Sequence, residues 1–129
     1  MADNQGIVRK LLDDFNAGDL EGMRKTLAGD LRSYVTNAEG GVDSLVGADE
    51  YLARVDAMDL PSAQFTVEPT QLVEVDANRV MVMVEVHAAR GGRTLHNFAT
   101  HLFAFNGDRI AEWWMVEALP AASDAFWSQ

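Results

Sequence analysis

The sequence of 129 residues contains no cysteine, which excludes disulfide bonds, a thiolate nucleophile and a cysteine-ligated metal site. It also has no apolar run of about 18 residues or more, the length needed to cross a bilayer. The first residues carry acids where a secretion signal needs a basic region followed by an apolar stretch. We therefore predict a cytoplasmic protein.

Basic residues are scarce, with 10 Lys and Arg against 20 Asp and Glu, and the formal net charge is −10. Phosphate backbones and anionic lipid headgroups repel such a chain, so we expect neither nucleic acid nor a membrane as a partner. Most of the acids are predicted to form the solvated outer faces of helices.

Hydrophobic residues make up 48% of the chain, which is ordinary globular composition and enough for one sizeable core. We detect no internal repeat, linker or low-complexity segment. The sequence therefore predicts one domain spanning residues 1–129.

The first half of the chain has helical periodicity. A first helix is predicted from Asp3 or Asn4 to Gly18, because apolar residues recur at the 3.6-residue spacing of one buried stripe. A second helix is expected from Asp19 to Gly29. A short strand at 31–36, a loop at 37–47 and a third helix with an apolar face follow. The inward residues of the three helices are Ile7, Val8, Leu11, Leu12 and Phe15; Leu20, Met23 and Leu27; and Tyr51, Leu52, Val55 and Met58.

The second half alternates with the period of two that is typical of strands. Strands are predicted at 65–75, 79–90, 93–105 and 109–118, joined by Gly91-Gly92 and Asn106-Gly107 hairpin turns. Residues 121–129 are expected to be a short tail. We interpret Phe126 and Trp127 in that tail as aromatics that dock over a pocket mouth or onto a partner subunit.

Helices followed by consecutive long strands predict an α+β fold, in which three N-terminal helices cover one face of a bent antiparallel sheet. The uncovered face would still be markedly apolar, which favours a homodimer through that outer sheet face. The residues that alternation places there include Met81, Met83, Glu85, Phe98, Leu102 and Trp114.

Two segments carry a resemblance to a known superfamily. FNAGDLEGM at the end of the first helix and HLFAFNGDRIAEWWMVEA at the last hairpin resemble SnoaL-like polyketide cyclases and ketosteroid isomerases of the nuclear-transport-factor-2-like superfamily. That resemblance implies a cone-shaped sheet with a pocket between its concave face and the helices. It specifies the fold better than the chemistry, because the superfamily contains enzymes of several kinds and binding proteins without catalysis.

The resemblance also locates family residues on this chain. The isomerase base falls at Val35 and its oxyanion-hole tyrosine at Leu11, so neither function is kept. The second oxyanion-hole residue falls at His101. The acid of the cyclases falls at Ala118, and the neighbouring Glu117 is the candidate to replace it.

His101 and Glu117 are therefore the candidate catalytic residues. Desolvation in an apolar cavity would raise the proton affinity of Glu117, and His101 could donate a proton or polarise a carbonyl. With a three-residue loop at 106–108, His101 would face Trp113 across the hairpin and Asn97 would face Glu117. The alternative is that these polar residues form hydrogen bonds with one another at the bottom of a closed core and have no catalytic role. The predicted substrate-binding residues are Leu11, Phe15, Val35, Tyr51, Val82, Val84, Val86, Asn97, Phe103, Trp113 and Met115.

We predict no cofactor. We also predict no metal site, because the three histidines are not expected to converge and have no metal-ligand spacing. The predicted function is binding of a small, largely apolar metabolite, with acid–base catalysis on a polyketide-, steroid- or terpenoid-like substrate as one possibility. A non-catalytic ligand-binding protein and a dimeric interaction module remain as alternatives.

Overall fold

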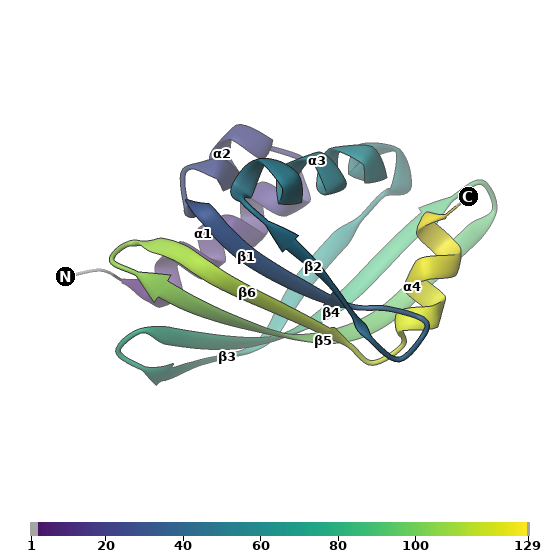
Figure 1. Cartoon of the computed structure of the whole chain (residues 1–129). Helices are drawn as coiled ribbons and strands as arrows, with labels where there is room; N and C mark the ends of the chain where they lie inside the picture. The colour runs from purple at the N-terminus through teal and green to yellow at the C-terminus, as the bar shows by residue number, and fades with distance from the viewer. Residues whose placement is uncertain (1–2, 129) are drawn as a thin grey trace.

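The computed structural model describes residues 3–128 and contains helices, a sheet and a short 3₁₀ turn (Figure 1). In chain order the elements are α1 (Asn4–Ala17), α2 (Leu20–Arg24), β1 (Leu27–Thr36), β2 (Val42–Val46), α3 (Ala48–Met58), the 3₁₀ turn (Leu60–Ala63), β3 (Thr66–Asp76), β4 (Arg79–Arg90), β5 (Arg93–Asn106), β6 (Arg109–Glu117) and α4 (Pro120–Trp127).

The six strands form one sheet in the order β2-β1-β6-β5-β4-β3. All neighbouring pairs are antiparallel except β1 and β6, which run parallel. The predicted α+β class is confirmed, while the prediction of a wholly antiparallel sheet is wrong for this one pair. After α3 the chain crosses to the far edge at β3 and returns strand by strand, so β6 arrives beside β1 in the same direction.

The three N-terminal helices lie over one face of the sheet (Figure 1). The helix α1 is capped at its start by Asp3, whose side chain accepts a hydrogen bond from the backbone N–H of Gly6, and at its end by Gly18, which has a positive φ of 70°. Its apolar stripe packs on β3 and β4, and the alternating burial along β4 is as predicted. Fully or almost fully buried residues in this contact are Val8, Leu11, Leu12, Val80, Val82 and Val84.

Three boundaries differ from the sequence prediction. The predicted loop at 37–47 contains β2, an edge strand that pairs only with β1 and shows a weak alternating burial pattern. The second helix ends at Arg24, because Leu27 already belongs to β1 and packs in the core. The predicted C-terminal tail is the helix α4, with Pro120 in its first turn, where its missing N–H leaves no hydrogen bond unmade.

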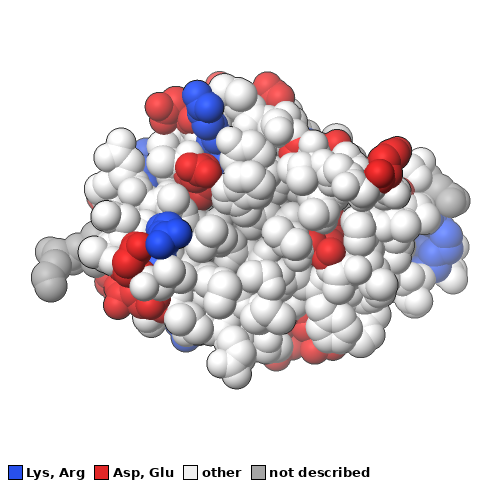
Figure 2. Space-filling model, turned by 60° about the horizontal axis from the view of Figure 1, so that its bottom comes forward, with Lys and Arg blue, Asp and Glu red and all other residues white. Residues whose placement is uncertain are grey.

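The outer face of the sheet remains partly apolar. Met83, Phe98 and Val116 are 39%, 44% and 49% exposed, and Figure 2 shows this side of the molecule with charged groups mainly toward its margins. Pairing of two copies through this face stays a prediction. Within the described residues no helix is long and apolar enough to cross a membrane, and the cytoplasmic location likewise stays a prediction.

Candidate functional site

A cavity of about 170 Å³ lies between the concave face of the sheet and the helices α1, α3 and α4. One part of its wall is apolar and comes from Leu12, Phe15, Val55, Phe65 and Val67. The other part is polar. It contains Asn97, His101, Glu117 and Ser123, with Arg54 and Asp124 also contributing. The cavity can therefore hold an apolar body and present hydrogen-bonding groups to one side of it.

His101 lies on β5 and is 9% exposed. Its Nδ1 accepts a hydrogen bond of 3.1 Å from the indole Nε1–H of Trp113, so the ring proton belongs on Nε2. No described residue forms a hydrogen bond with this Nε2, and the atom is not fully buried. Because His101 lines the cavity, Nε2 faces it. Burial lowers the pKa of His101 to about 4. The ring is therefore neutral at neutral pH and presents one N–H donor to a ligand.

This low pKa predicts that the protein loses stability in mild acid. The unfolded chain takes up a proton on His101 near pH 6.5, whereas the folded protein does so only near pH 4. Acidification across this interval therefore stabilises the unfolded state. From pH 7 to pH 5 the wild type should lose about 2 kcal/mol more of its free energy of unfolding than the variant His101→Gln. Urea unfolding of both proteins at the two pH values measures the difference, and equal losses would contradict it.

Glu117 ends β6 and is partly buried at the polar wall. Its Oε2 accepts hydrogen bonds from Asn97 Nδ2, at 3.1 Å, and from the hydroxyl of Ser123. Its Oε1 has no partner among the described residues and is available to a ligand. Burial raises the pKa of Glu117, and Asp124 adds to this, while the Ser123 hydrogen bond and Arg54 oppose it. The carboxylate is thus a stronger base than an ordinary exposed glutamate.

Asn97 is the polar centre that joins this wall to α4. Its side-chain oxygen accepts from the backbone N–H groups of Phe98, at 2.8 Å, and Leu119, at 3.0 Å. Its Nδ2 lies 3.0 Å from the carbonyl oxygen of Leu119 and 2.9 Å from Ser123 Oγ. The side chain is almost completely buried, so these hydrogen bonds replace water that cannot reach it. Asn97 therefore fixes the start of α4 against the sheet.

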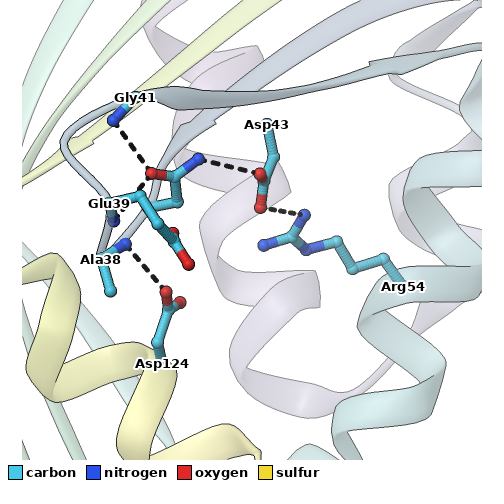
Figure 3. A network of polar contacts seen from close by, with 7 residues as sticks. Ala38, Glu39, Gly41, Asp43, Arg54 and Asp124 are labelled. Carbon is cyan, nitrogen blue, oxygen red and sulfur yellow. Dashed lines mark hydrogen bonds and ion pairs between the residues drawn. The ribbon is translucent and has the colours of Figure 1, made fainter.

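Figure 3 shows a second polar network, between the β1–β2 turn and the helices α3 and α4. Arg54 from α3 pairs with Asp43, at 3.3 Å, and Asp43 accepts from Nδ2 of Asn37 in the turn. Asp124 from α4 accepts from the backbone N–H of Ala38, at 2.9 Å. Because Arg54 and Asp124 also line the cavity, this network holds the two helices on either side of it.

The structure brings most of the predicted site residues to the cavity but not all of them. Those that line it are Phe15, Val35, Tyr51, Val86, Asn97, His101, Met115 and Glu117. The hydroxyl of Tyr51 lies 3.9 Å from the sulfur of Met115, and burial raises the pKa of Tyr51, so it stays a neutral donor. The other predicted residues are almost completely buried in the core behind the cavity, namely Leu11, Val82, Val84, Phe103 and Trp113.

The predicted pairing across the last hairpin is wrong by two residues. Asn106 pairs with Arg109, and an irregularity after Ala104 shifts the register. His101 therefore lies opposite Met115 instead of Trp113, and Glu117 lies opposite Ala99 instead of Asn97. His101 and Glu117 still share one face, as diagonal neighbours on adjacent strands, where side chains lie about 7–8 Å apart. No hydrogen bond joins them.

Sequence reasoning expected Trp127 at the pocket mouth but missed that it lies on a helix, and missed Ser123 and Asp124. Ser123, Asp124 and Trp127 all line the cavity, and Trp127 packs on Phe65 with ring centroids 5.9 Å apart. The available signal was Pro120, because proline is frequent in the first turn of a helix. Placing Ser123 and Trp127 on such a helix would have brought them within reach of the β5 and β6 residues.

On the opposite, outer face two of the three histidines lie together, although all three do not converge. His87 on β4 and His96 on β5 are directly paired, and their rings stack with centroids 4.4 Å apart. Both approach the carboxylate of Glu85. His101 is separate from this group, on the cavity side.

Comparison with known proteins finds a matching family and solved structures of similar fold. Residues 8–113 match the SnoaL-like domain, whereas a search of curated protein sequences finds no match. Among solved structures, Bal32a from a soil-derived mobile gene cassette is 20% identical with a TM-score of 0.83, covering 96% of this chain and 95% of that one.

Two further structures are similar. A nuclear-transport-factor-2-like protein of unknown function from Burkholderia pseudomallei is 21% identical over 100% of both chains, with a TM-score of 0.82. A candidate SnoaL-like polyketide cyclase from Jannaschia sp. is 17% identical, with a TM-score of 0.78, over 98% of this chain and 92% of that one. At these identities the likeness establishes the fold.

Proposed function

The chain belongs to the SnoaL-like domain family, and on this premise we propose that it binds a compact, largely apolar carbonyl compound and moves a proton next to the carbonyl group. The observation that supports this is a pair of unused polar atoms on one cavity wall. Oε1 of Glu117 can accept a proton, and Nε2 of His101 can donate a hydrogen bond.

In the proposed reaction, Glu117 removes a proton from the carbon beside the carbonyl. Negative charge then develops on the carbonyl oxygen, where the Nε2–H of the neutral His101 stabilises it by a hydrogen bond. The protonated Glu117 returns the proton to the same or another carbon, which gives exchange or isomerisation. The raised pKa of Glu117 favours both directions of this transfer.

The size of the cavity limits the ligand. A cavity of about 150 Å³ in another protein holds one benzene molecule, and the present cavity measures about 170 Å³. A single ring or a short branched chain therefore fits. A four-ring steroid exceeds this volume and would protrude from the cavity mouth. Among the predicted classes this favours a monocyclic terpenoid or a short polyketide fragment.

Replacement of Glu117 by Gln tests the proposal directly. Cyclohexanone, a single-ring ketone, is incubated with the protein in D₂O, and loss of its α-proton signal is followed by proton NMR. The wild type should accelerate exchange above the buffer rate. Glu117→Gln should reduce the protein-dependent rate by about 100-fold or more, since general base catalysis contributes about 10²–10⁴, with little change in the shape of the site.

The exposed Glu74 on β3 provides a control, because Glu74→Gln removes the same charge away from the cavity and should leave the exchange rate unchanged. His101→Gln should lower the rate while retaining an acceptor for the Trp113 indole. Equal exchange rates for the wild type and Glu117→Gln would remove Glu117 from the mechanism.

A second candidate function, binding without catalysis, has an observation of its own. Oε2 of Glu117 is already held by Asn97 and Ser123, so the carboxylate also anchors α4. Under this alternative cyclohexanone raises the melting temperature of the protein in proportion to its binding, but its α-protons exchange no faster than in buffer.

We further propose that the protein acts in the cytoplasm as a homodimer paired through the outer sheet face. The exposed apolar side chains of Met83, Phe98 and Val116 support this pairing. A monomeric mass by light scattering at micromolar concentration would count against it.

A further inference from the structure

The outer face of the sheet carries a cluster of three potential metal ligands. They are Glu85 and His87, two residues apart on β4, and His96 on β5, directly opposite His87. One ligand atom from each residue can be chosen so that all three lie within 4.8 Å of one another. The two histidine side chains are 51% and 54% exposed, so a dissolved ion can reach them.

The arrangement of the donor atoms suits a transition metal. Both imidazole rings present Nε2 to the same oxygen, Oε2 of Glu85, at 3.3 Å from His87 and closer from His96. In a tetrahedral zinc site with bonds of about 2.0–2.1 Å, neighbouring ligand atoms are about 3.3 Å apart. Small rotations of these exposed side chains are enough to open the Glu85–His96 contact to that distance.

The electrostatic surroundings also favour a cation. Glu68 on β3 lies opposite Glu85 in the strand register, and two like charges placed opposite each other destabilise a sheet. The chain as a whole carries a formal net charge of −10. A divalent ion bound at Glu85 would offset this local repulsion.

We propose that Glu85, His87 and His96 form a binding site for one divalent transition-metal ion of the Zn²⁺ class, with water in the fourth position. Two imidazoles and one carboxylate are ligands that zinc accepts in proteins, whereas Mg²⁺ prefers oxygen ligands alone. All three ligands come from one chain, and they lie on the outer sheet face through which we propose that two copies pair. The site is separate from the cavity and independent of the proposed catalysis.

Titration calorimetry with zinc chloride on the metal-free, tag-free protein tests this proposal. We expect one ion per chain and no binding of Mg²⁺. His87→Gln and His96→Gln should each weaken zinc binding by about 100-fold or more, because even loss of an outer-shell partner costs about 10–100-fold. Glu39→Gln, which removes an exposed acid in the β1–β2 turn, is the matched control and should bind zinc like the wild type.

A second readout identifies the ligands without relying on the variants. In proton NMR, zinc should shift the imidazole signals of His87 and His96 and leave those of His101 unchanged. The variants change only exposed side chains, so circular dichroism should show an unchanged fold. Absence of saturable zinc binding, or equal zinc affinity in the wild type and both histidine variants, would overturn the proposal.

Discussion

Asn97→Ala is expected to lower the free energy of unfolding by about 3 kcal/mol. The substitution removes a buried side chain that satisfies the backbone N–H groups of Phe98 and Leu119 and the carbonyl of Leu119. It also takes one donor from Glu117. Each buried polar group left without a partner costs about 1–3 kcal/mol. Water that enters the space left by the side chain hydrogen-bonds to some of these groups and so limits the total loss of stability. Urea denaturation measures the loss.

The loss at Asn97 should be concentrated in α4. Native-state hydrogen exchange is expected to show faster exchange of the α4 amides than of the β4 amides, because β4 keeps all its neighbours. Asn106→Ala, at an exposed position beside the last hairpin turn, is the control and should stay within about 0.5 kcal/mol of the wild type. A similar small effect at Asn97 would show that it does not hold α4 in place.

Trp113→Ala should cost about 4 kcal/mol, within the usual range for truncating a buried large aromatic residue. Trp113 is completely buried, and its ring centroid lies 4.8 Å from that of Tyr51 and 5.0 Å from that of Phe103. The substitution also removes the indole donor to Nδ1 of His101. Chemical denaturation measures the loss. Unfolding is followed by circular dichroism, because the substitution removes a tryptophan and so alters tryptophan fluorescence.

The adjacent Trp114 is a matched control, because alternation places it on the outer face. Its ring stacks on Tyr34 with centroids 3.9 Å apart, and its Nε1–H donates to Glu112 at 2.8 Å. Trp114→Ala should cost only about 1 kcal/mol, the usual contribution of an aromatic pair. If the two variants lost equal stability, the assignment of Trp113 to the core and Trp114 to the outer face would be wrong.

Periodicity predicted the parts of the fold whose side chains face a core. The stripe from Val8 to Phe15 and the alternation from Val80 to Val84 each match one buried surface. It failed at β2, where Val42 and Val46 are exposed and the strand has a single neighbour. An edge strand of this kind is defined by backbone hydrogen bonds to a segment elsewhere in the chain, which local sequence does not encode.

The candidate site was predictable to the level of strand faces but not of contacts. Alternation placed His101 and Glu117 on one face, and the structure has both lining the cavity. The irregularity after Ala104 was not predicted, because a three-residue loop at 106–108 was assumed and no residue pattern in the hairpin indicates the shift. The pairing of His87 with His96 could have been predicted, because a two-residue turn at Gly91-Gly92 places Arg90 opposite Arg93 and therefore His87 opposite His96.

The parallel pairing of β1 with β6 has a consequence for synthesis of the chain. The two strands are separated by the whole of β2, α3, β3, β4 and β5, and long-range contacts of this kind slow folding. During translation the β1–β2 hairpin emerges early but cannot join the sheet until β6 has left the ribosome. Until then the edge of β1 that pairs with β6 lacks its partner and is open to chaperones or to aggregation.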